Sequence, residues 1–234
     1  MKVWKAIQIM FNDFISLCYP HTCLVCNKNL FRNEYHICTP CLYKIPKTTC
    51  FKEKDNKVSS LFLGRVVLQN AAALYEFNKT GSLQKIISHL KYKGNTDVGV
   101  LLGKQVGLAL KESNYFTNID LIIPIPLHPL KEKKRGYNQS YFIAKGIEKV
   151  LHIPINTKSL IRVENTDSQT RKKRYNRWEN MRNSFAVLNN KVLRNKHLLL
   201  IDDVLTTGAT LEACTIKLLE IEGVKVSIAT IAVA

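Results

Sequence analysis

The sequence predicts an α/β protein with a mostly parallel sheet, which follows a small cysteine-rich module. After residue 60, short apolar segments of strand length alternate with apolar residues at helical spacing, a pattern typical of a parallel sheet flanked by helices. Six of the seven cysteines lie between Cys18 and Cys50. A chain of 234 residues can bury one ordinary core beside a small appended module.

Four segments are predicted strands because they are apolar and short. They span residues 71–77, 121–125, 198–201 and 224–233. Helices are predicted between and after them, with starts and stops taken from capping residues. These helices begin after the cap Ser82, at the cap Asp97, near Gln139 and near Thr210, and the first and last end at Gly94 and Gly223.

Residues 1–17 are predicted to form an amphipathic helix, because apolar residues from Trp4 to Ile15 recur at helical spacing. This helix either packs on the body of the protein or rests on a membrane surface. No apolar run approaches the roughly 18–20 residues that span a bilayer, and no signal peptide is recognisable. The protein is therefore expected in the cytoplasm, without a membrane span.

Residues 52–60 are polar and unpatterned and are interpreted as a linker. The expected domains are residues 1–55, with the N-terminal helix and the cysteine module, and residues 61–234, with the sheet. The net charge of +17 is uneven: between Lys131 and Lys196, 17 Lys and Arg residues stand against 5 Asp and Glu residues. Such a concentration of positive charge indicates phosphate-rich ligands, nucleic acid or an acidic protein as partners.

The cysteine spacing predicts a metal site. Cys23-x-x-Cys26 and Cys38-x-x-Cys41 are separated by 11 residues, which suits four thiolates around a tetrahedral, structural Zn²⁺. Disulfides or a redox pair are the alternatives, and other nearby residues are alternative ligands: Cys18, His21, His36 and Cys50. A module this small gains much of its folding energy from metal. It could grip DNA, dock a partner protein, or cover an edge of the sheet domain.

One segment combines two acidic residues with a hydroxyl-rich loop. Asp202 and Asp203 follow a predicted buried strand, and the loop from Thr206 to Thr210 leads into a helix. Backbone N–H groups at a helix N-terminus bind anions, and Gly208 lets the backbone approach a phosphate. The carboxylates suit the vicinal hydroxyls of a ribose, and the Lys of a nucleotide P-loop is absent. The segment predicts a sugar-phosphate site; the alternative is a polar turn capped by threonine.

This segment resembles, at each defined position, the motif that binds phosphoribosyl pyrophosphate (PRPP) in type I phosphoribosyltransferases, which implies their fold. The motifs Leu-Lys-Tyr-Lys-Gly at residues 90–94, Ile-Pro-Ile-Pro-Leu-His-Pro at 123–129 and Arg-Gly-Tyr-Asn-Gln at 135–139, with the cysteines, are similar to the ComF/GntX family. The resemblance covers nearly the whole chain. It implies PRPP as ligand and a role in bacterial DNA uptake, in which the cysteine module could dock a competence helicase. The several negative charges of the pyrophosphate leaving group favour Mg²⁺ as cofactor.

The resemblance also implies roles for single residues. Asp202 and Asp203 would contact the ribose hydroxyls, and with Arg135 they are the candidate catalytic residues. The PRPP-binding segment would comprise Asp202, Asp203, Val204, Leu205, Thr206, Thr207, Gly208, Ala209 and Thr210. Residues 169–177 would form a flexible loop over the site. The candidates for binding pyrophosphate are His128, Arg135, Arg171 and Arg174.

Thr206 departs from the purine-salvage enzymes of this superfamily, which carry there an Asp that assists proton transfer. Threonine cannot act as a base near neutral pH, so a 6-oxopurine acceptor is disfavoured. Two functions then fit the sequence. The protein is an enzyme that transfers phosphoribosyl from PRPP to an unknown acceptor, or it is a single-stranded-DNA-handling factor that keeps the PRPP site for sensing or structure.

Residues 169–178 interleave cations with aromatic side chains, which also fits a groove for single-stranded DNA. Lys and Arg side chains would meet the backbone, while Tyr175 and Trp178 stack on bases. The alternative is a solvated basic face. The candidate nucleic-acid residues are Arg171, Lys172, Lys173, Arg174, Tyr175 and Arg177.

Overall fold

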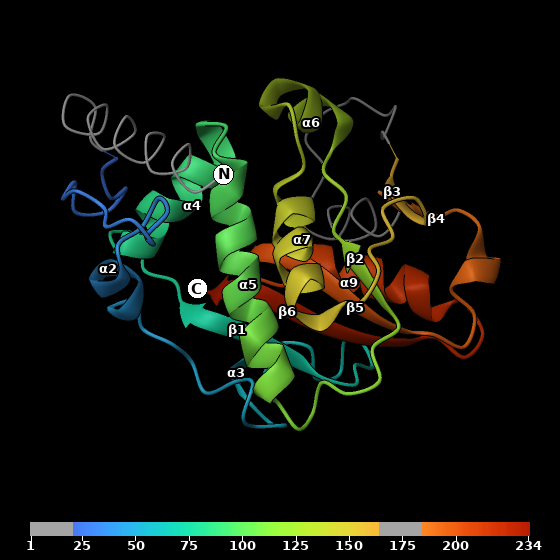
Figure 1. Cartoon of the computed structure of the whole chain (residues 1–234). Coiled ribbons are helices and arrows are strands. Elements are labelled where there is room, and N and C mark those ends of the chain that lie inside the picture. Colours follow the sequence, from blue (N-terminus) through green and yellow to red (C-terminus); the bar gives the residue numbers. More distant parts are fainter. Residues whose placement is uncertain (1–20, 164–183) are drawn as a thin grey trace, which may run out of the picture.

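The computed structural model describes residues 21–163 and 184–234 and has a four-stranded parallel sheet at its centre (Figure 1). The strands, in spatial order, are β1 (Ala71–Glu76), β6 (Lys225–Val233), β5 (His197–Leu205) and β2 (Leu121–Pro124). A separate antiparallel pair is formed by β3 (Leu160–Arg162) and β4 (Phe185–Val187). The four predicted strands are confirmed. β5 is longer than predicted, because it continues through the acidic pair to Leu205.

Helices cover both faces of the sheet. α5 (Thr96–Glu112) and α7 (Gln139–Leu151) lie side by side on one face, and α9 (Ala209–Leu219) lies on the other (Figure 1). α5 and α7 come very close where Gly103 meets Gly146: a Cβ atom at Gly103 would lie 2.1 Å from the Ile143 carbonyl oxygen. Only glycine permits this approach. The remaining helices are α2 (Thr39–Tyr43), α3 (Lys57–Ser60), α4 (Ser82–Tyr92), α6 (Pro129–Arg135) and the 3-10 helix η1 (Asn190–Val192).

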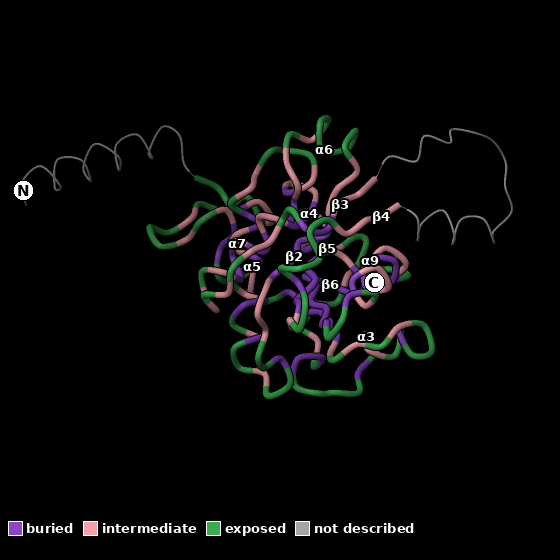
Figure 2. The backbone as a smooth tube through the Cα atoms, turned by 90° about the vertical axis from the view of Figure 1, so that its right-hand side faces the viewer, coloured by how far each residue is buried: buried purple, intermediate pink, exposed green. Residues whose placement is uncertain are grey.

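The central strands are buried on both faces, which is why they are unbroken apolar runs in the sequence. Residues 198–201 of β5 have no exposed surface, and Figure 2 shows this buried centre in purple under exposed loops. Because β2, β5 and β6 run parallel, their carboxyl ends meet at one edge of the sheet. Ligands of open parallel sheets bind at that edge.

Two predicted caps are displaced. α4 follows the N-cap Gly81 rather than being capped by Ser82, and α5 follows the N-cap Asn95, so that Asp97 lies in the first turn. An acidic residue in the first turn still interacts favourably with the helix dipole.

The interpretation of residues 52–60 as an unpatterned linker is wrong. Asn56 caps α3 by accepting hydrogen bonds from the backbone N–H groups of Val58 and Ser59. Its side-chain amide also donates to the Ala71 carbonyl oxygen at 3.0 Å, and Val58 is fully buried. This segment is therefore packed against β1. The division into residues 1–55 and 61–234 remains a prediction.

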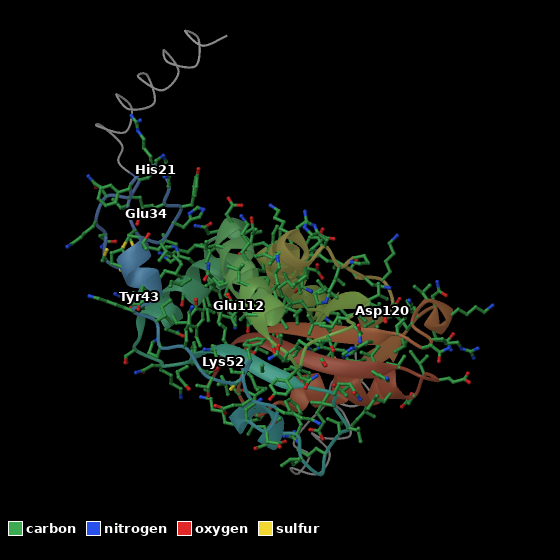
Figure 3. All side chains as sticks on the ribbon, turned by 60° about the horizontal axis from the view of Figure 1, so that its bottom comes forward. His21, Glu34, Tyr43, Lys52, Glu112 and Asp120 are labelled. Carbon is green, nitrogen blue, oxygen red and sulfur yellow. The ribbon has the colours of Figure 1, made fainter. Side chains whose placement is uncertain are left out.

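The cysteine-rich segment lies at one end of the molecule. Figure 3 shows Glu34 and Tyr43 at that end and Asp120 near the other. The segment is joined to the sheet where Thr48 N–H donates to the Leu74 carbonyl oxygen at the edge of β1, at 2.9 Å. No helix among the described residues is long and apolar enough to cross a membrane. The helix predicted for residues 1–17 lies outside the described residues.

Candidate functional site

The acidic pair ends β5 at the carboxyl edge of the sheet. Asp203 is 4% exposed, whereas Asp202 keeps some exposed surface. The Lys91 Nζ atom lies 2.8 Å from the Asp203 Oδ2 atom, which places the last turn of α4 against the strand end. A charge this deeply buried requires a partner, and Lys91 supplies it.

Asp202 is held by neutral donors. Its Oδ1 atom accepts a hydrogen bond from the Ser140 hydroxyl of α7 at 3.1 Å and one from the Asp203 backbone N–H at 2.8 Å. Burial, to which the negative charge of Asp203 adds, raises the pKa of Asp202 to about 7. Near neutral pH this carboxyl group therefore exchanges its proton readily, and donors that favour the carboxylate form would shift it towards full ionisation.

A small hollow follows the acidic pair. It is lined by Asp202 and by residues 204–211, which run from the end of β5 into α9. Gly208 has a left-handed backbone with φ of 76°, and a Cβ atom there would lie 3.0 Å from Phe62. Glycine thus permits both the turn and the packing against Phe62. The hollow opens at the N-terminus of α9, where backbone N–H groups and the helix dipole favour an anion.

Arg65 fixes the turn that contains Thr207. The Arg65 guanidinium donates to the Thr207 carbonyl oxygen at 3.0 Å and forms an ion pair with Glu212, which is 4% exposed in the first turn of α9. An unpaired carboxylate at this helix N-terminus would repel an incoming anion. Arg65 neutralises Glu212 and fixes the loop at the same time.

The loop after β2 is fastened to the end of α4. The Tyr137 hydroxyl donates to the Leu90 carbonyl oxygen, and the Arg135 guanidinium lies over the Tyr92 ring at 5.6 Å. Asn138 caps α7, and its amide donates to the Ile125 carbonyl oxygen at 2.9 Å. The three motifs at residues 90–94, 123–139 and 202–210 are therefore in contact.

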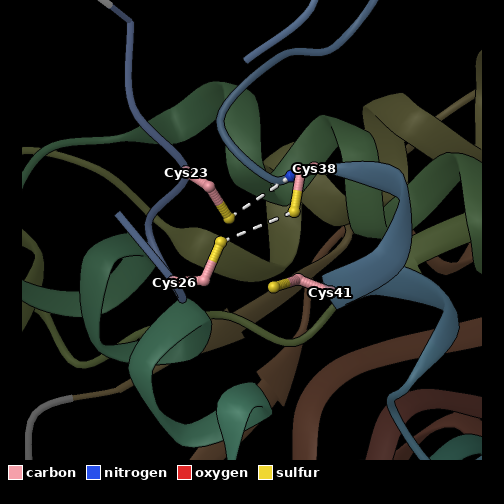
Figure 4. Close-up of side chains that lie close together, drawn as sticks. All are labelled: Cys23, Cys26, Cys38 and Cys41. Atoms are coloured by element: carbon pink, nitrogen blue, oxygen red, sulfur yellow. Dashed lines mark hydrogen bonds between the residues drawn. The ribbon is translucent and has the colours of Figure 1, made fainter. Parts of the chain in front are cut away.

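The four predicted metal ligands form a second cluster, shown in Figure 4. The sulfur atoms of Cys23, Cys26, Cys38 and Cys41 all lie within 4.8 Å of one another. Cys26 Sγ and Cys38 Sγ are 3.7 Å apart, close to the edge of about 3.8 Å that Zn–S bonds of about 2.3 Å give a tetrahedron. The cluster is thus compatible with zinc. The alternative ligands His21, His36 and Cys50 are not part of it, and Cys18 lies outside the described residues.

In the first Cys-x-x-Cys pair, Cys23 favours the thiolate form. Burial opposes ionisation of Cys23, but the backbone N–H groups of Cys38, Cys26 and Val25 lower its pKa to about 6. Burial and the neighbouring sulfurs raise the pKa of Cys41. One thiolate among crowded thiols is the state expected of a site whose further ionisation requires a cation.

Known proteins are similar to most of this chain. Residues 138–234 match the phosphoribosyl transferase domain family. Competence protein ComFC of Bacillus subtilis is 25% identical over 93% of this chain and 83% of its own length. DNA utilization protein YhgH of Escherichia coli K12 is 24% identical over 83% of this chain and 88% of its own length.

The chain is similar to proteins of the ComF/YhgH competence family, at about 25% identity over most of its length. Competence protein F of Haemophilus influenzae is 29% identical over 61% of this chain, but the alignment spans only 64% of that relative. Among solved structures, the PRPP amidotransferase of B. subtilis aligns with 61% of this chain and 30% of its own at 16% identity; its TM-score of 0.42 adds nothing to the assignment. The described residues thus have an α/β fold with a parallel sheet, and residues 138–234 of it match the phosphoribosyl transferase domain family.

The predicted site residues fall into three groups. Asp202 and residues 204–210 line the hollow, whereas Asp203 is buried and paired with Lys91. His128 caps α6 by accepting a hydrogen bond from the Leu130 N–H at 3.2 Å. Arg135 contacts Gln139 as well as Tyr92. Binding of pyrophosphate by His128 and Arg135 stays a prediction. The remaining predicted residues lie outside the described part of the chain: Arg171, Lys172, Lys173, Arg174, Tyr175 and Arg177.

Sequence reasoning missed Lys91, Ser140, Arg65 and Glu212. Lys91 belongs to a motif that marked the family, but nothing in the sequence places it beside Asp203. Arg65 lies 142 residues from the carbonyl group that it binds. Both Lys91 and Arg65 also precede the matched residues 138–234, so the site extends beyond that region.

The raised pKa of Asp202 gives a testable prediction. Because the folded protein holds this proton up to about pH 7 whereas an unfolded Asp releases it near pH 4, the contribution of Asp202 to stability falls as the pH rises from about 4 to about 7. A carboxyl-carbon NMR titration should show one aspartate with a midpoint near 7, and Asp202→Asn should remove it.

Lys91 lowers the pKa of Asp202 through its charge, so Lys91→Met should move that midpoint upward. Lys93→Met is the matched control, because it removes the same charge from the exposed residue that follows α4, and it should leave the midpoint in place. Equal midpoints in the wild type and Lys91→Met would contradict the described ion pair.

Proposed function

We propose that this protein binds PRPP at the carboxyl edge of its sheet and transfers the phosphoribosyl group to an acceptor. The observation that carries the proposal is the direct succession of two carboxylates and an open helix N-terminus. Asp202 and Asp203 suit the two ribose hydroxyls, and the loop of residues 206–210 suits the 5-phosphate. Both parts of one ligand are thereby matched on a single strand-loop-helix unit.

The chemistry would rest on charge stabilisation. Transfer breaks the bond from the ribose to pyrophosphate through an oxocarbenium-like state, and the leaving group carries several negative charges. The pyrophosphate oxygens of PRPP would provide most ligands of Mg²⁺, and the carboxylates of Asp202 and Asp203 are of the type that this ion accepts. Arg135 and His128, with Arg171 and Arg174, are the proposed partners of the pyrophosphate.

Calorimetry with PRPP and MgCl₂ tests this site. The wild type should bind, and the double substitution of Asp202→Ala with Asp203→Ala should weaken binding at least tenfold, because it removes both acceptors of the ribose hydroxyls. A matched control is Glu220→Ala with Glu222→Ala, which removes the same charge from exposed positions.

The control should bind as the wild type does. Equal heats for the wild type and the Asp202/Asp203 variant would contradict the site. Incubation with PRPP and a panel of nucleobases, nucleosides and single-stranded DNA, read out by pyrophosphate release, would identify the acceptor.

We also propose a structural zinc ion at Cys23, Cys26, Cys38 and Cys41. The spacing of the sulfurs and the lowered pKa of Cys23 support it. Metal would join the two Cys-x-x-Cys pairs and so stabilise a segment with little core of its own. Metal analysis of the purified protein should find one zinc per chain, and Cys38→Ser should lower that content strongly. Cys50→Ser, a buried cysteine outside the cluster, should retain the metal.

A second proposed function is binding of single-stranded DNA, associated with DNA uptake. The surplus of cations between Lys131 and Lys196 and the names of the DNA utilization and competence relatives support it. Affinity for an oligonucleotide should fall steeply between low and moderate salt, because bound phosphates release counterions. Neutralising Arg171, Lys172, Lys173 and Arg174 should reduce the salt slope. A salt-independent affinity would contradict an electrostatic groove.

A further inference from the structure

A second pocket lies at the outer edge of the sheet, beyond β2. Its volume is about 430 Å³, and it is bounded by the end of β2, by α6, by the start of α7 and by Thr157. Its lining includes no residue of the hollow formed by residues 202–211. A cavity of this size falls in the range of small-molecule sites, about 300–1,000 Å³.

Flat apolar groups form most of its wall. Pro124, Pro126, Tyr137, Tyr141 and Phe142 line it, and the rings of Tyr137 and Tyr141 each meet Phe142 edge to face, with centroids 5.6 and 5.4 Å away. Tyr137 is fixed through its hydroxyl to the Leu90 carbonyl oxygen. The wall is therefore preformed, which reduces the entropy lost when a planar ligand stacks on it.

Several exposed cations lie on the segments that form this wall. Lys131, Lys133 and Lys134 are exposed on α6, and Lys158 is exposed beside Thr157. The Lys145 Nζ atom lies 5.4 Å from the centre of the Tyr141 ring. Aromatic stacking surfaces bordered by Lys are the combination that binds single-stranded nucleic acid without regard to duplex shape. A purely apolar ligand would leave these cations without partners.

The lining also contains one acidic side chain. Glu132 is exposed at the pocket, and within residues 21–163 and 184–234 no ion pair holds its carboxylate. A carboxylate accepts hydrogen bonds from the exocyclic amino groups of adenine, cytosine and guanine, which thymine lacks. Since Lys131, Lys133 and Lys134 on the same helix offset its charge, Glu132 can select a base without repelling the whole strand.

We infer that this pocket receives one nucleobase of a single strand, whose neighbouring phosphates lie along Lys131, Lys133 and Lys134. The inference rests on the second proposed function, since it gives the DNA strand a defined contact. A base that carries an amino group is preferred to thymine. The half-buried Tyr141 ring is the proposed stacking surface, and Glu132 is the specificity-determining residue.

The test uses the full chain and short single-stranded oligonucleotides of equal length and charge, measured by fluorescence anisotropy. The first strand is all cytosine, the second is all thymine and the third is abasic at most positions. The wild type should bind the cytosine strand about tenfold more tightly than the abasic strand. Glu132→Gln should reduce the preference for cytosine over thymine, and Tyr141→Ala should weaken binding of the cytosine strand about tenfold while leaving the abasic strand unchanged.

Tyr43→Ala is the matched control, because Tyr43 is 88% exposed in the cysteine-rich segment (Figure 3) and does not line the pocket; this variant should bind all strands as the wild type does. Equal binding of the cytosine and abasic strands by the wild type would overturn base binding in the pocket while leaving electrostatic DNA binding intact. This comparison uses the wild type alone and so does not depend on the folding of any variant. Absence of any binding would overturn the proposed DNA binding as well. An acidic peptide that binds the wild type and is weakened by Tyr141→Ala, with no effect of the bases, would also overturn the inference.

Discussion

Two adjacent carboxylates at the end of a buried strand repel each other, and the site is arranged around that repulsion. Asp203 is almost fully enclosed, so its charge requires a cation within hydrogen-bonding distance, and Lys91 provides it. Asp202 instead accepts hydrogen bonds from neutral donors, and its carboxyl group keeps its proton up to about pH 7. The site thus holds one charge as an ion pair, and near neutral pH the other carboxyl group is partly protonated. Hydroxyl groups of a ligand that donate to Asp202 would favour its carboxylate form.

That requirement explains why distant segments converge. For Lys91 to reach β5, the end of α4 must lie across the carboxyl edge of the sheet, and there it becomes the support to which Tyr137 and Arg135 attach. The loop after β2 is consequently positioned by α4 as much as by its own strand. On the other side, Arg65 holds the turn at Thr207 and neutralises Glu212. Charge compensation therefore contributes to the geometry of this edge beside apolar packing.

The sequence predicts the sheet well because its strands are buried on both faces and so appear as unbroken apolar runs. It fails at residues 52–60, where polarity suggests a linker. There a single Asn56 satisfies the end of α3 and the edge of β1 together, an arrangement that depends on a tertiary contact with Ala71. The end of β5 is missed for a related reason: Asp202 and Asp203 read as loop residues, whereas Lys91 and Ser140 supply the partners that let them remain in a strand.

For the site, local motifs indicate ligand chemistry but not the residues that complete it. The hollow at residues 202–211 follows from one contiguous segment, and so does the cysteine cluster. Lys91 and Arg65 could not be predicted, because ion pairs over such sequence separations leave no periodic pattern. The pocket beyond β2 is likewise built from three separate stretches of the chain, so no single motif in the sequence indicates it.

A crystal structure of the protein soaked with PRPP and Mg²⁺ would show whether PRPP binds at the carboxyl edge of the sheet. We expect the ribose hydroxyls on Asp202 and Asp203 and the 5-phosphate at the backbone N–H groups of residues 206–210. We also expect the Lys91–Asp203 contact to be lengthened or broken. PRPP bound elsewhere, or an empty hollow with that contact unchanged, would contradict the proposed site.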